Sequence, residues 1–289
     1  MNRNAPVTVI VPAYNAAPFL QVTLQSLQQQ TVQPTQVILV DDGSTDDTAA
    51  IAERHGATVI RQKQRGPGAA RNRGLAEATT EFVAFLDADD WYVPDKLERC
   101  VTTLTDLNAA SVATDAWIVR DDRVEGRKNQ QRVVPTALTL ELLLRDNPIV
   151  CSTVVARRAA VLEAGGFDED PALVATEDFD LWLRMAKREP FAYLPQPLTF
   201  YRVHAGSLSA NSRFLRGIDR IMEKVAQEHT GEVHFLNLVK ARRADVRLDL
   251  AWDLLGAGRK QEARQLIAEA TGMARSWKAL RMRLRCLLH

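Results

Sequence analysis

The segment FVAFLDADD, residues 82–90, is the strongest indication of the fold class in this chain. It begins with five apolar residues and ends with three carboxylates, Asp87, Asp89 and Asp90. A short apolar run of this kind is typical of a strand that is buried on both faces of a parallel sheet. The acidic residues then lie at the carboxyl end of that strand, where parallel sheets bind their ligands.

Three similar apolar runs precede this segment, at residues 7–11, 37–40 and 58–60. Between them, helical patterns cover residues 17–30 and 69–78. This alternation predicts an α/β fold with a mainly parallel, Rossmann-like sheet that is flanked by helices and joined by right-handed crossovers.

The second half of the chain changes in character twice. Its middle part mixes patterns: residues 110–119 and 191–201 favour strands, 139–145 and 177–187 favour helices, and 121–132 favour an exposed loop or hairpin. Beyond residue 208 the pattern is helical, with a turn at residues 256–258. We therefore predict an α/β domain at residues 1–207 and a C-terminal α-helical extension at residues 208–289.

The chain has 289 residues, of which 46% are apolar and 25% charged, which excludes a disordered, collagen-like or disulfide-dense protein. Its net charge of +1 hides an imbalance, because residues 205–289 hold 16 Lys and Arg against 9 Asp and Glu.

No signal-peptide core and no run of 18 apolar residues is present. Cys100, Cys151 and Cys286 are odd in number and widely spaced, which predicts reduced thiols and a cytoplasmic location.

Two acidic turns follow strands of the predicted sheet. Asp41 and Asp42 come directly after the strand at 37–40, and Asp87 and Asp89 follow the strand described first. Each turn alone is explained by a polar strand end or a helix cap. Together at one sheet edge, the carboxylates repel one another unless a cation or hydrogen-bond donors offset their charge. Hard oxygen ligands of this kind favour Mg²⁺ or Mn²⁺.

A turn with two glycines precedes the helix at 69–78 and brings Arg71 close to its start. A loop-to-helix turn with a guanidinium group suits a phosphate, because backbone N–H groups and the arginine both favour an anion. The GxGxxG fingerprint of dinucleotide-binding proteins is absent after the first strand. A sugar nucleotidyltransferase, an alternative enzyme class, would have a glycine-rich basic loop where this chain has PAYN at residues 12–15.

Six short motifs occur in an order that resembles the family 2 glycosyltransferases of the GT-A fold. They are VTVIVPAYN (7–15), VDDGSTD (40–46), GAARNRG (68–74), FLDADD (85–90), TEDFDLWLR (176–184) and YRVH (201–204). The resemblance implies a catalytic domain at 1–207 that transfers a sugar, with inversion, from a nucleoside-diphosphate sugar to a hydroxyl of a glycan or lipid-linked acceptor. It also implies Mg²⁺ or Mn²⁺ as cofactor and a place in cell-envelope polysaccharide biosynthesis. UDP is the first choice of nucleotide and dTDP the second.

The resemblance further implies roles for individual residues. Donor binding is expected from Pro12, Ala13, Tyr14, Asn15, Asp42, Arg71, Asp87 and Ala88. The cation is expected on Asp89, with Asp87 and His204 as further ligands. Asp178 is expected to be the general base that deprotonates the acceptor hydroxyl. Contacts with the acceptor or the sugar are expected from Trp91, Glu177, Trp182 and Arg202.

Several of these residues also have a purely structural interpretation. Trp91 and Trp182 suit a hydrophobic core, Glu177 suits an ion pair with an arginine, and His204 suits a packed or capping position. A non-catalytic nucleotide-sugar-binding or scaffold protein on the same fold is the alternative to an enzyme. The intact acidic positions argue against that alternative.

Residues 273–289 form a basic amphipathic tail with five Lys and Arg and no acid. In a helix, Trp277, Leu280 and further leucines of the tail would share one face. Such a helix either lies peripherally on the anionic inner face of the plasma membrane or packs on the preceding helices. The basic residues are confined to the chain end and match no nucleic-acid motif, so we expect no nucleic-acid partner.

Overall fold

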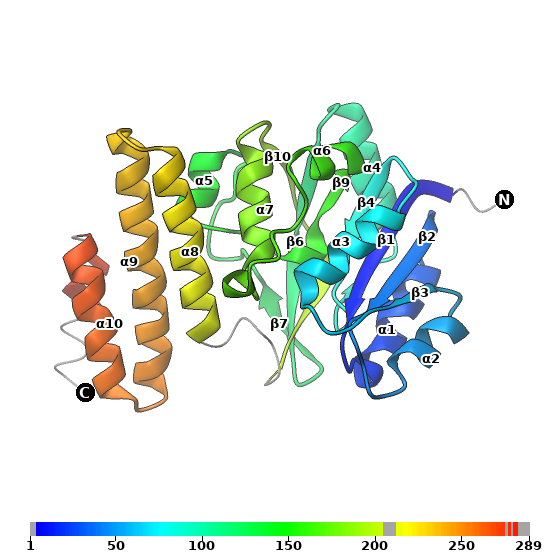
Figure 1. Ribbon diagram of the computed structural model, residues 1–289, viewed down its shortest axis with the longest axis horizontal. Helices are drawn as coiled ribbons and strands as arrows, with labels where there is room; N and C mark the ends of the chain where they lie inside the picture. Colours follow the sequence, from blue (N-terminus) through cyan, green and yellow to red (C-terminus); the bar gives the residue numbers. More distant parts are fainter. Residues whose placement is uncertain (1–3, 205–211, 275–276, 279, 283–289) are drawn as a thin grey trace.

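The computed structural model describes residues 4–204, 212–274, 277–278 and 280–282. The first half of the chain alternates strands and helices as predicted (Figure 1). Its elements are β1 (Asn4–Ala13), α1 (Ala17–Gln28), β2 (Gln33–Asp41), α2 (Thr48–Arg54), β3 (Thr58–Arg61), α3 (Pro67–Glu77) and β4 (Phe82–Phe85). The four strands pair in parallel in the order β3-β2-β1-β4, so the predicted parallel sheet is confirmed for this half.

The second half extends the same sheet with mixed strand directions. Its elements are β5 (Trp91–Tyr92), α4 (Lys96–Asp106), β6 (Ser111–Arg120), β7 (Arg123–Arg127), β8 (Ala137–Leu138), α5 (Leu140–Arg145), η1 (Cys151–Thr153), β9 (Val155–Arg157), α6 (Arg158–Glu163), η2 (Pro171–Leu173), α7 (Glu177–Ala186) and β10 (Phe191–Val203). The order continues β4-β9-β6-β10-β5, and β9 is antiparallel to both of its neighbours. The 3-10 turn η1 lies at the carboxyl edge of β4, and β9 therefore runs away from that edge.

Helices cover both faces of the sheet. Along β1, Val9 and Val11 pack with α1 and α4 on one face, whereas Ile10 packs with α3 and α7 on the other. This period of two is the geometry of a strand that is buried on both sides. At Gly74 of α3, an added Cβ would lie 2.5 Å from Ile10 Cγ2, so the glycine brings this helix directly onto β1.

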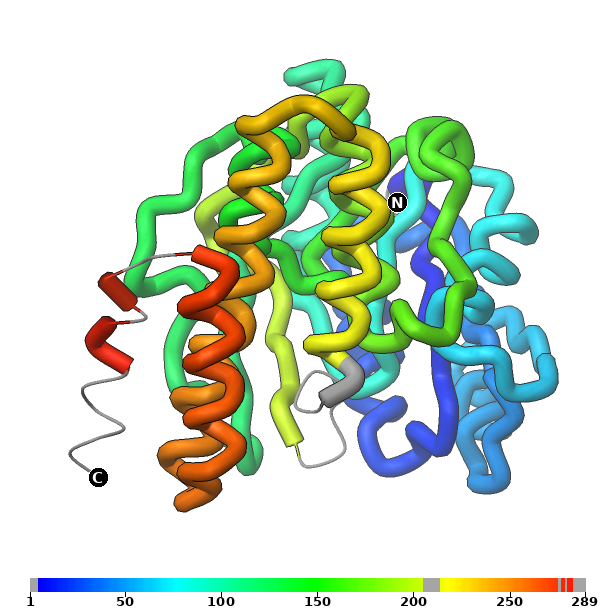
Figure 2. Tube along the Cα trace, turned by 60° about the vertical axis from the view of Figure 1, so that its left-hand side comes forward, coloured from blue at the N-terminus to red at the C-terminus, as the bar shows by residue number. Residues whose placement is uncertain are grey.

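The C-terminal extension is a stack of three helices, α8 (Ser212–Glu228), α9 (Val233–Gly256) and α10 (Lys260–Met273). Figure 2 shows the three side by side, with α8 nearest the sheet domain. Buried residues of α8 and α9, including Ile221 and Val239, belong to the same hydrophobic cluster as Trp182 of α7. A separate cluster joins α9 to α10. The hydrophobic core is thus continuous across residue 207, and the two-domain division stays a prediction.

Only part of the basic tail lies within the described residues. Met282 is buried in the α9–α10 cluster, and Lys278 pairs with Asp249 of α9 at 2.8 Å, whereas Trp277 is 80% exposed. Leu280 is 46% exposed, whereas Arg275, Arg283, Leu284, Arg285, Cys286, Leu287 and Leu288 lie outside the described residues. Cys100 and Cys151 are buried free thiols, as predicted. Among the helices of the described chain, none is both long and apolar enough to cross a membrane.

Candidate functional site

The acidic turn at residues 87–90, which we call the D-x-D turn after Asp87 and Asp89, lies at the carboxyl end of β4. The buried carboxyl of Asp90 anchors it. Asp90 accepts hydrogen bonds from Ser152 Oγ at 2.6 Å and from the backbone N–H of Arg202 at 2.8 Å. Ser152 Oγ also accepts from the Asp87 N–H at 3.0 Å. Burial raises the pKa of Asp90 well above its usual range, and the charges of Asp89 and Asp87 add to the effect. The turn is therefore held by groups from two distant segments of the chain, Ser152 and the Arg202 backbone.

Sequence reasoning missed Ser152 and gave Asp90 no role. Ser152 lies in no motif, and its chain separation from Asp90 is 62 residues, so only the folded chain brings the two together. Asp90 could have been found from the sequence, because it is the third carboxylate that follows the apolar run at residues 82–86.

Two of the predicted cation ligands lie in contact. His204 Nε2 is 3.0 Å from Asp89 Oδ2, and the imidazole packs on the Phe19 ring with the centroids 4.9 Å apart. Burial raises the pKa of Asp89, and repulsion from Asp87 adds to the rise. The fold thus brings His204 and Asp89 into contact although 115 residues separate them, and their role as cation ligands stays a prediction.

Arg202 fastens the end of β10 to this turn. Its Nε donates to the Asp89 carbonyl at 3.2 Å, and its guanidinium lies over the rings of Phe19 and Trp91. Trp91 in turn stacks on Phe200 with the centroids 5.0 Å apart. Trp91 and Arg202 are therefore placed beside the D-x-D turn, and their contacts with a sugar stay predictions.

The residues of this turn have the chemistry of a partial site for a hard divalent cation. Within the part of the chain that the structure describes, no three His, Cys, Asp or Glu side chains converge as a complete metal centre. Asp89 and His204 supply one oxygen and one nitrogen ligand, and Asp87 is already paired with an arginine. Mg²⁺ and similar ions typically bind through one or two carboxylates together with substrate phosphates, so an incomplete protein set fits them.

Arg71 does not lie free for a phosphate, which corrects the sequence-based expectation. Its guanidinium is buried, with Nη1 2.6 Å from Glu177 Oε1 and Nη2 2.6 Å from Asp87 Oδ1. Both terminal nitrogens are thus engaged by carboxylates, because folding places α3 between the D-x-D turn and α7. Arg71 consequently links the cation side of the site to the helix of the expected general base. For Glu177, the structural interpretation, an ion pair with an arginine, is the contact that is observed.

Asp178 follows Glu177 in the first turn of α7. Its Oδ1 accepts from the Phe179 N–H at 2.7 Å. Burial raises the pKa of Asp178 to about 7, and the negative charge of Glu177 adds to the rise, while Arg71 opposes it. A carboxyl with a pKa near neutrality exchanges a proton readily at physiological pH, which is the property required of a general base.

The predicted nucleotide edge lies at the ends of β1 and β2. Asp42 accepts from the backbone N–H groups of Arg65 and Gly66, each at 2.8 Å, and so holds the loop that leads into α3. Asn15 Oδ1 accepts from the Thr45 N–H at 2.8 Å and holds the acidic turn. Tyr14 is 48% exposed beside them, whereas Pro12, Ala13 and Ala88 are buried. Base contacts of Tyr14 and Asp42 stay predictions.

Trp182 does not contact a substrate, and this expectation was wrong. Its side chain is fully buried, in edge contact with Phe167 and Phe191 at centroid distances of 6.2 and 5.6 Å. Trp182 lies four residues beyond Asp178 in α7, but its side chain belongs to the hydrophobic core. The core alternative is therefore the observed one.

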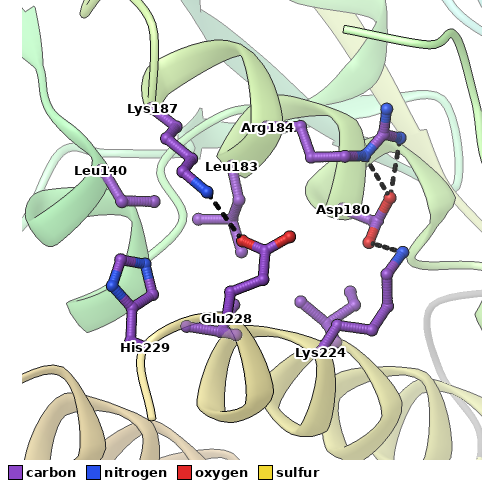
Figure 3. Close-up of a pocket in the computed structure, with 10 residues that line it drawn as sticks. Leu140, Asp180, Leu183, Arg184, Lys187, Lys224, Glu228 and His229 are labelled. Carbon is purple, nitrogen blue, oxygen red and sulfur yellow. Dashed lines mark hydrogen bonds and ion pairs between the residues drawn. The ribbon is translucent and has the colours of Figure 1, made fainter. Parts of the chain in front are cut away.

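A cavity of about 30 Å³ lies elsewhere, between α7 and α8 (Figure 3). Its charged residues are paired across the two helices: Lys187 with Glu228, and Lys224 with Asp180. None of the catalytic or cation-binding candidates lines it. The cavity marks the contact of α8 with α7 and is not the proposed active site.

The D-x-D turn, the acidic start of α7 and the parallel half-sheet define a glycosyltransferase of the GT-A fold. The model of Glycosyl transferase family 2 matches residues 8–166, more than half of the chain, and the chain belongs to this family. The match ends before α7, so Glu177, Asp178 and His204 lie beyond it.

Two curated relatives are similar over most of their length. One is the putative teichuronic acid biosynthesis glycosyltransferase TuaG of Bacillus subtilis, 31% identical over 212 residues, which cover 71% of this chain and 82% of that protein. The other is the UDP-Glc:alpha-D-GlcNAc-diphosphoundecaprenol beta-1,3-glucosyltransferase WfaP of Escherichia coli, 30% identical over 210 residues, which cover 71% and 80%.

Two solved structures share the fold. Residues 1–349 of TarS from S. aureus, in complex with UDP, superpose with a TM-score of 0.61 at 23% identity, covering 83% of this chain and 70% of that one. The mannosyltransferase PcManGT of Pyrobaculum calidifontis, in complex with GDP-Man and Mn2+, superposes with a TM-score of 0.63 at 20% identity, covering 99% and 80%.

Proposed function

We propose that this protein is an inverting, metal-dependent glycosyltransferase that uses a nucleoside-diphosphate sugar and a hydroxyl acceptor. The single observation that carries the proposal is the ion-pair bridge from Asp87 through Arg71 to Glu177, next to Asp178. It couples a cation-binding turn to a carboxyl whose pKa is raised to about 7. Family membership favours glycosyl transfer over nucleotidyl transfer and over a scaffold role.

In the proposed reaction, Asp178 accepts the proton of the acceptor hydroxyl. The hydroxyl oxygen forms a bond to the anomeric carbon while the bond from that carbon to the diphosphate breaks on the opposite side, which inverts the configuration. Asp89 and His204 would hold Mg²⁺ or Mn²⁺, and the bound cation would supply charge neutralisation for the departing diphosphate. A positioned base typically contributes about 10²–10⁴-fold to the rate.

Glu177 is proposed to orient the acceptor. Its Oε1 is engaged by Arg71, whereas its Oε2 is buried and has no hydrogen-bond partner among the described residues. A buried carboxylate oxygen without a donor is costly, and an acceptor hydroxyl would satisfy it.

For the donor we propose a UDP-sugar, supported by the UDP in the TarS complex and the UDP-Glc in the name of the Escherichia coli relative. For the acceptor we propose a lipid-linked glycan of the cell envelope, supported by the diphosphoundecaprenol and teichuronic acid in the relatives' names. The exposed Trp277 and the basic tail support peripheral contact with an anionic membrane.

The proposal is tested with the full chain, Mn²⁺ and a panel of UDP-, dTDP- and GDP-sugars. We expect one UDP-sugar to raise the melting temperature in the presence of Mn²⁺, and to be converted to UDP when an undecaprenyl-diphosphate-linked sugar is added. Product analysis by NMR reports the anomeric configuration. Retention of configuration, or full turnover in EDTA, would overturn the mechanism.

A further inference from the structure

The first helix of the C-terminal extension touches the residue that immediately precedes the acidic pair of α7. At Gly217 of α8, an added Cβ would lie 2.1 Å from Thr176 Oγ1 and 3.0 Å from Thr176 Cγ2. Thr176 is fully buried and its carbonyl accepts from the Asp180 N–H, which closes the first turn of α7. The glycine therefore lets α8 lie directly against the turn that holds Glu177 and Asp178.

Charged contacts fix α8 to the same region. Lys224 Nζ lies 2.5 Å from Asp180 Oδ1 (Figure 3). It also lies 2.8 Å from Asp168 Oδ2, so one ammonium group joins α7 to the segment before it. Arg220 pairs with Asp170, at the start of η2, at 3.0 Å. These contacts lie on successive turns of α8, with Gly217 at one end of the row.

Apolar packing joins the same two helices. Ile218, Ile221 and Met222 of α8 are buried in one cluster with Phe179 and Trp182 of α7. The turn that contains Asp178 is thus enclosed by α8 through packing, through ion pairs and through one close backbone approach. The family match ends at residue 166 and includes neither helix.

We propose that α8 is a positioning element of the active site, in which Gly217 and Lys224 set the position of Asp178 by holding Thr176 and Asp180. This inference rests on the proposed role of Asp178 as general base. Because ordinary contact between non-bonded heavy atoms needs about 3.5 Å, a methyl group 2.1 Å from Thr176 Oγ1 has to displace that residue by more than about 1 Å. A displacement of that size at a reacting group costs about 10²-fold in rate.

The test compares two helical glycines. Gly217→Ala meets Thr176, whereas Gly272→Ala, in α10, meets nothing within 4 Å and is the matched control. We expect Gly217→Ala to lower kcat by about 10²-fold while the Kd for UDP with Mn²⁺ stays unchanged, since Gly217 meets Thr176, which is not among the proposed cation ligands. The acid limb of its pH profile should also move to lower pH, because loosened packing lessens the burial that raises the pKa of Asp178. Gly272→Ala should match the wild type in kcat, Kd and pH profile.

Rescue distinguishes positioning from general damage. Thr176→Ala removes the two nearest atoms, so Gly217→Ala should cost much less in the Thr176→Ala background than in the wild type. An equal loss of kcat in both backgrounds, or a weakened Kd for UDP, would overturn the proposal. If Gly217→Ala does not fold, Lys224→Gln takes its place, with the exposed Lys240→Gln as control.

An activity-independent measurement separates this inference from the proposed function. Hydrogen exchange at the Asp180 amide should speed up in Gly217→Ala and stay unchanged in Gly272→Ala. Wild-type protection in Gly217→Ala would overturn the positioning role alone. Full activity of Asp178→Asn would instead overturn the role of Asp178, and with it the functional part of this inference, while leaving the contact between α8 and α7 intact.

Discussion

Arg71 and Glu177, 106 residues apart in the chain, meet as a buried ion pair with Nη1 and Oε1 2.6 Å apart. The second terminal nitrogen of the same guanidinium contacts Asp87 at an equal distance. One arginine thereby offsets the charge of two carboxylates that belong to opposite sides of the proposed site. Burial lowers the pKa of Arg71, but the neighbouring charges of Asp87 and Glu177 outweigh it, raise that pKa well above its usual range and so hold the guanidinium charged.

Replacing Arg71 with methionine is expected to destabilise the fold strongly. It leaves Glu177 buried without its cation, and breaking a buried pair in this way costs about 3–5 kcal/mol. Urea unfolding measures the loss. The exposed Arg73→Met, which removes a surface pair with Glu77, should change the unfolding free energy by no more than about 0.5 kcal/mol. Equal losses of unfolding free energy in the two variants would contradict a stabilising role of the Arg71 ion pairs.

Asp178→Asn is expected to abolish transfer while leaving donor binding intact. Asparagine keeps the size of the side chain but accepts no proton, so kcat should fall by about 10²–10⁴-fold. Isothermal titration with UDP and Mn²⁺ should give the wild-type Kd. The exposed Asp106→Asn, in α4, is the control and should keep full activity. Weaker UDP binding in Asp178→Asn would assign this residue to the donor instead.

The pH dependence of activity follows from the pKa of Asp178, about 7. Below that value the carboxyl is protonated and accepts no proton, so kcat should rise about tenfold per pH unit up to about pH 7 and then level off. The pH profile of kcat at saturating substrate measures this limb. A flat profile between pH 5 and 7 would argue against Asp178 as the base.

The unfolding free energy should fall as pH rises, in contrast to kcat. The folded state keeps the Asp178 proton up to about pH 7, whereas the unfolded chain releases it near 3.8, so this residue lowers the unfolding free energy as pH rises between those values. Asp89 and Asp90, whose pKa values are also raised, act in the same direction. Asp178→Asn should therefore be more stable than the wild type at pH 8 and gain less at pH 4. Equal gains at both pH values would contradict the raised pKa.

Asp89→Asn is expected to weaken cation binding. It removes the charged oxygen that lies against His204, and a hard divalent ion prefers carboxylate ligands. Electron paramagnetic resonance of Mn²⁺ in the presence of UDP should report at least a tenfold weaker apparent affinity. Asp47→Asn, an exposed carboxylate before α2, should leave that affinity unchanged. Unchanged affinity in Asp89→Asn would place the ion elsewhere.

Removal of residues 273–289 is expected to reduce binding to anionic membranes. The tail contributes five basic side chains and the exposed Trp277. Sedimentation with vesicles of mixed phosphatidylglycerol and phosphatidylcholine measures the loss, and vesicles of phosphatidylcholine alone are the control. Equal sedimentation of both chain lengths would support the alternative, a tail that packs on α9 through Met282 and Lys278.

Local signals were sufficient for much of the fold. The apolar runs predicted β1 to β4, and the acidic turns after β2 and β4 were correctly expected at one edge of the sheet. Downstream of β4 the patterns predicted β6 and β10 but not β5, β8 or β9, and they gave no strand directions. The direction of a strand depends on the edge of the sheet at which the chain enters it. The chain enters β9 from the edge where Ser152 donates a hydrogen bond to Asp90, so β9 runs antiparallel to β4. No local pattern records that contact.

The parallel half-sheet, the family resemblance and the residue types of the site follow from the amino-acid sequence alone, because each depends on neighbours in the chain. The contacts of each side chain follow only from the folded structure. It brought Asp89 and His204 together, turned Trp182 into the core and engaged Arg71 between two carboxylates. It also brought α8, outside the family match, against the start of α7. Arg71 contacts residues 16 and 106 positions away, and Asp89 and His204 are 115 positions apart, whereas sequence periodicity reports only on contacts within one element.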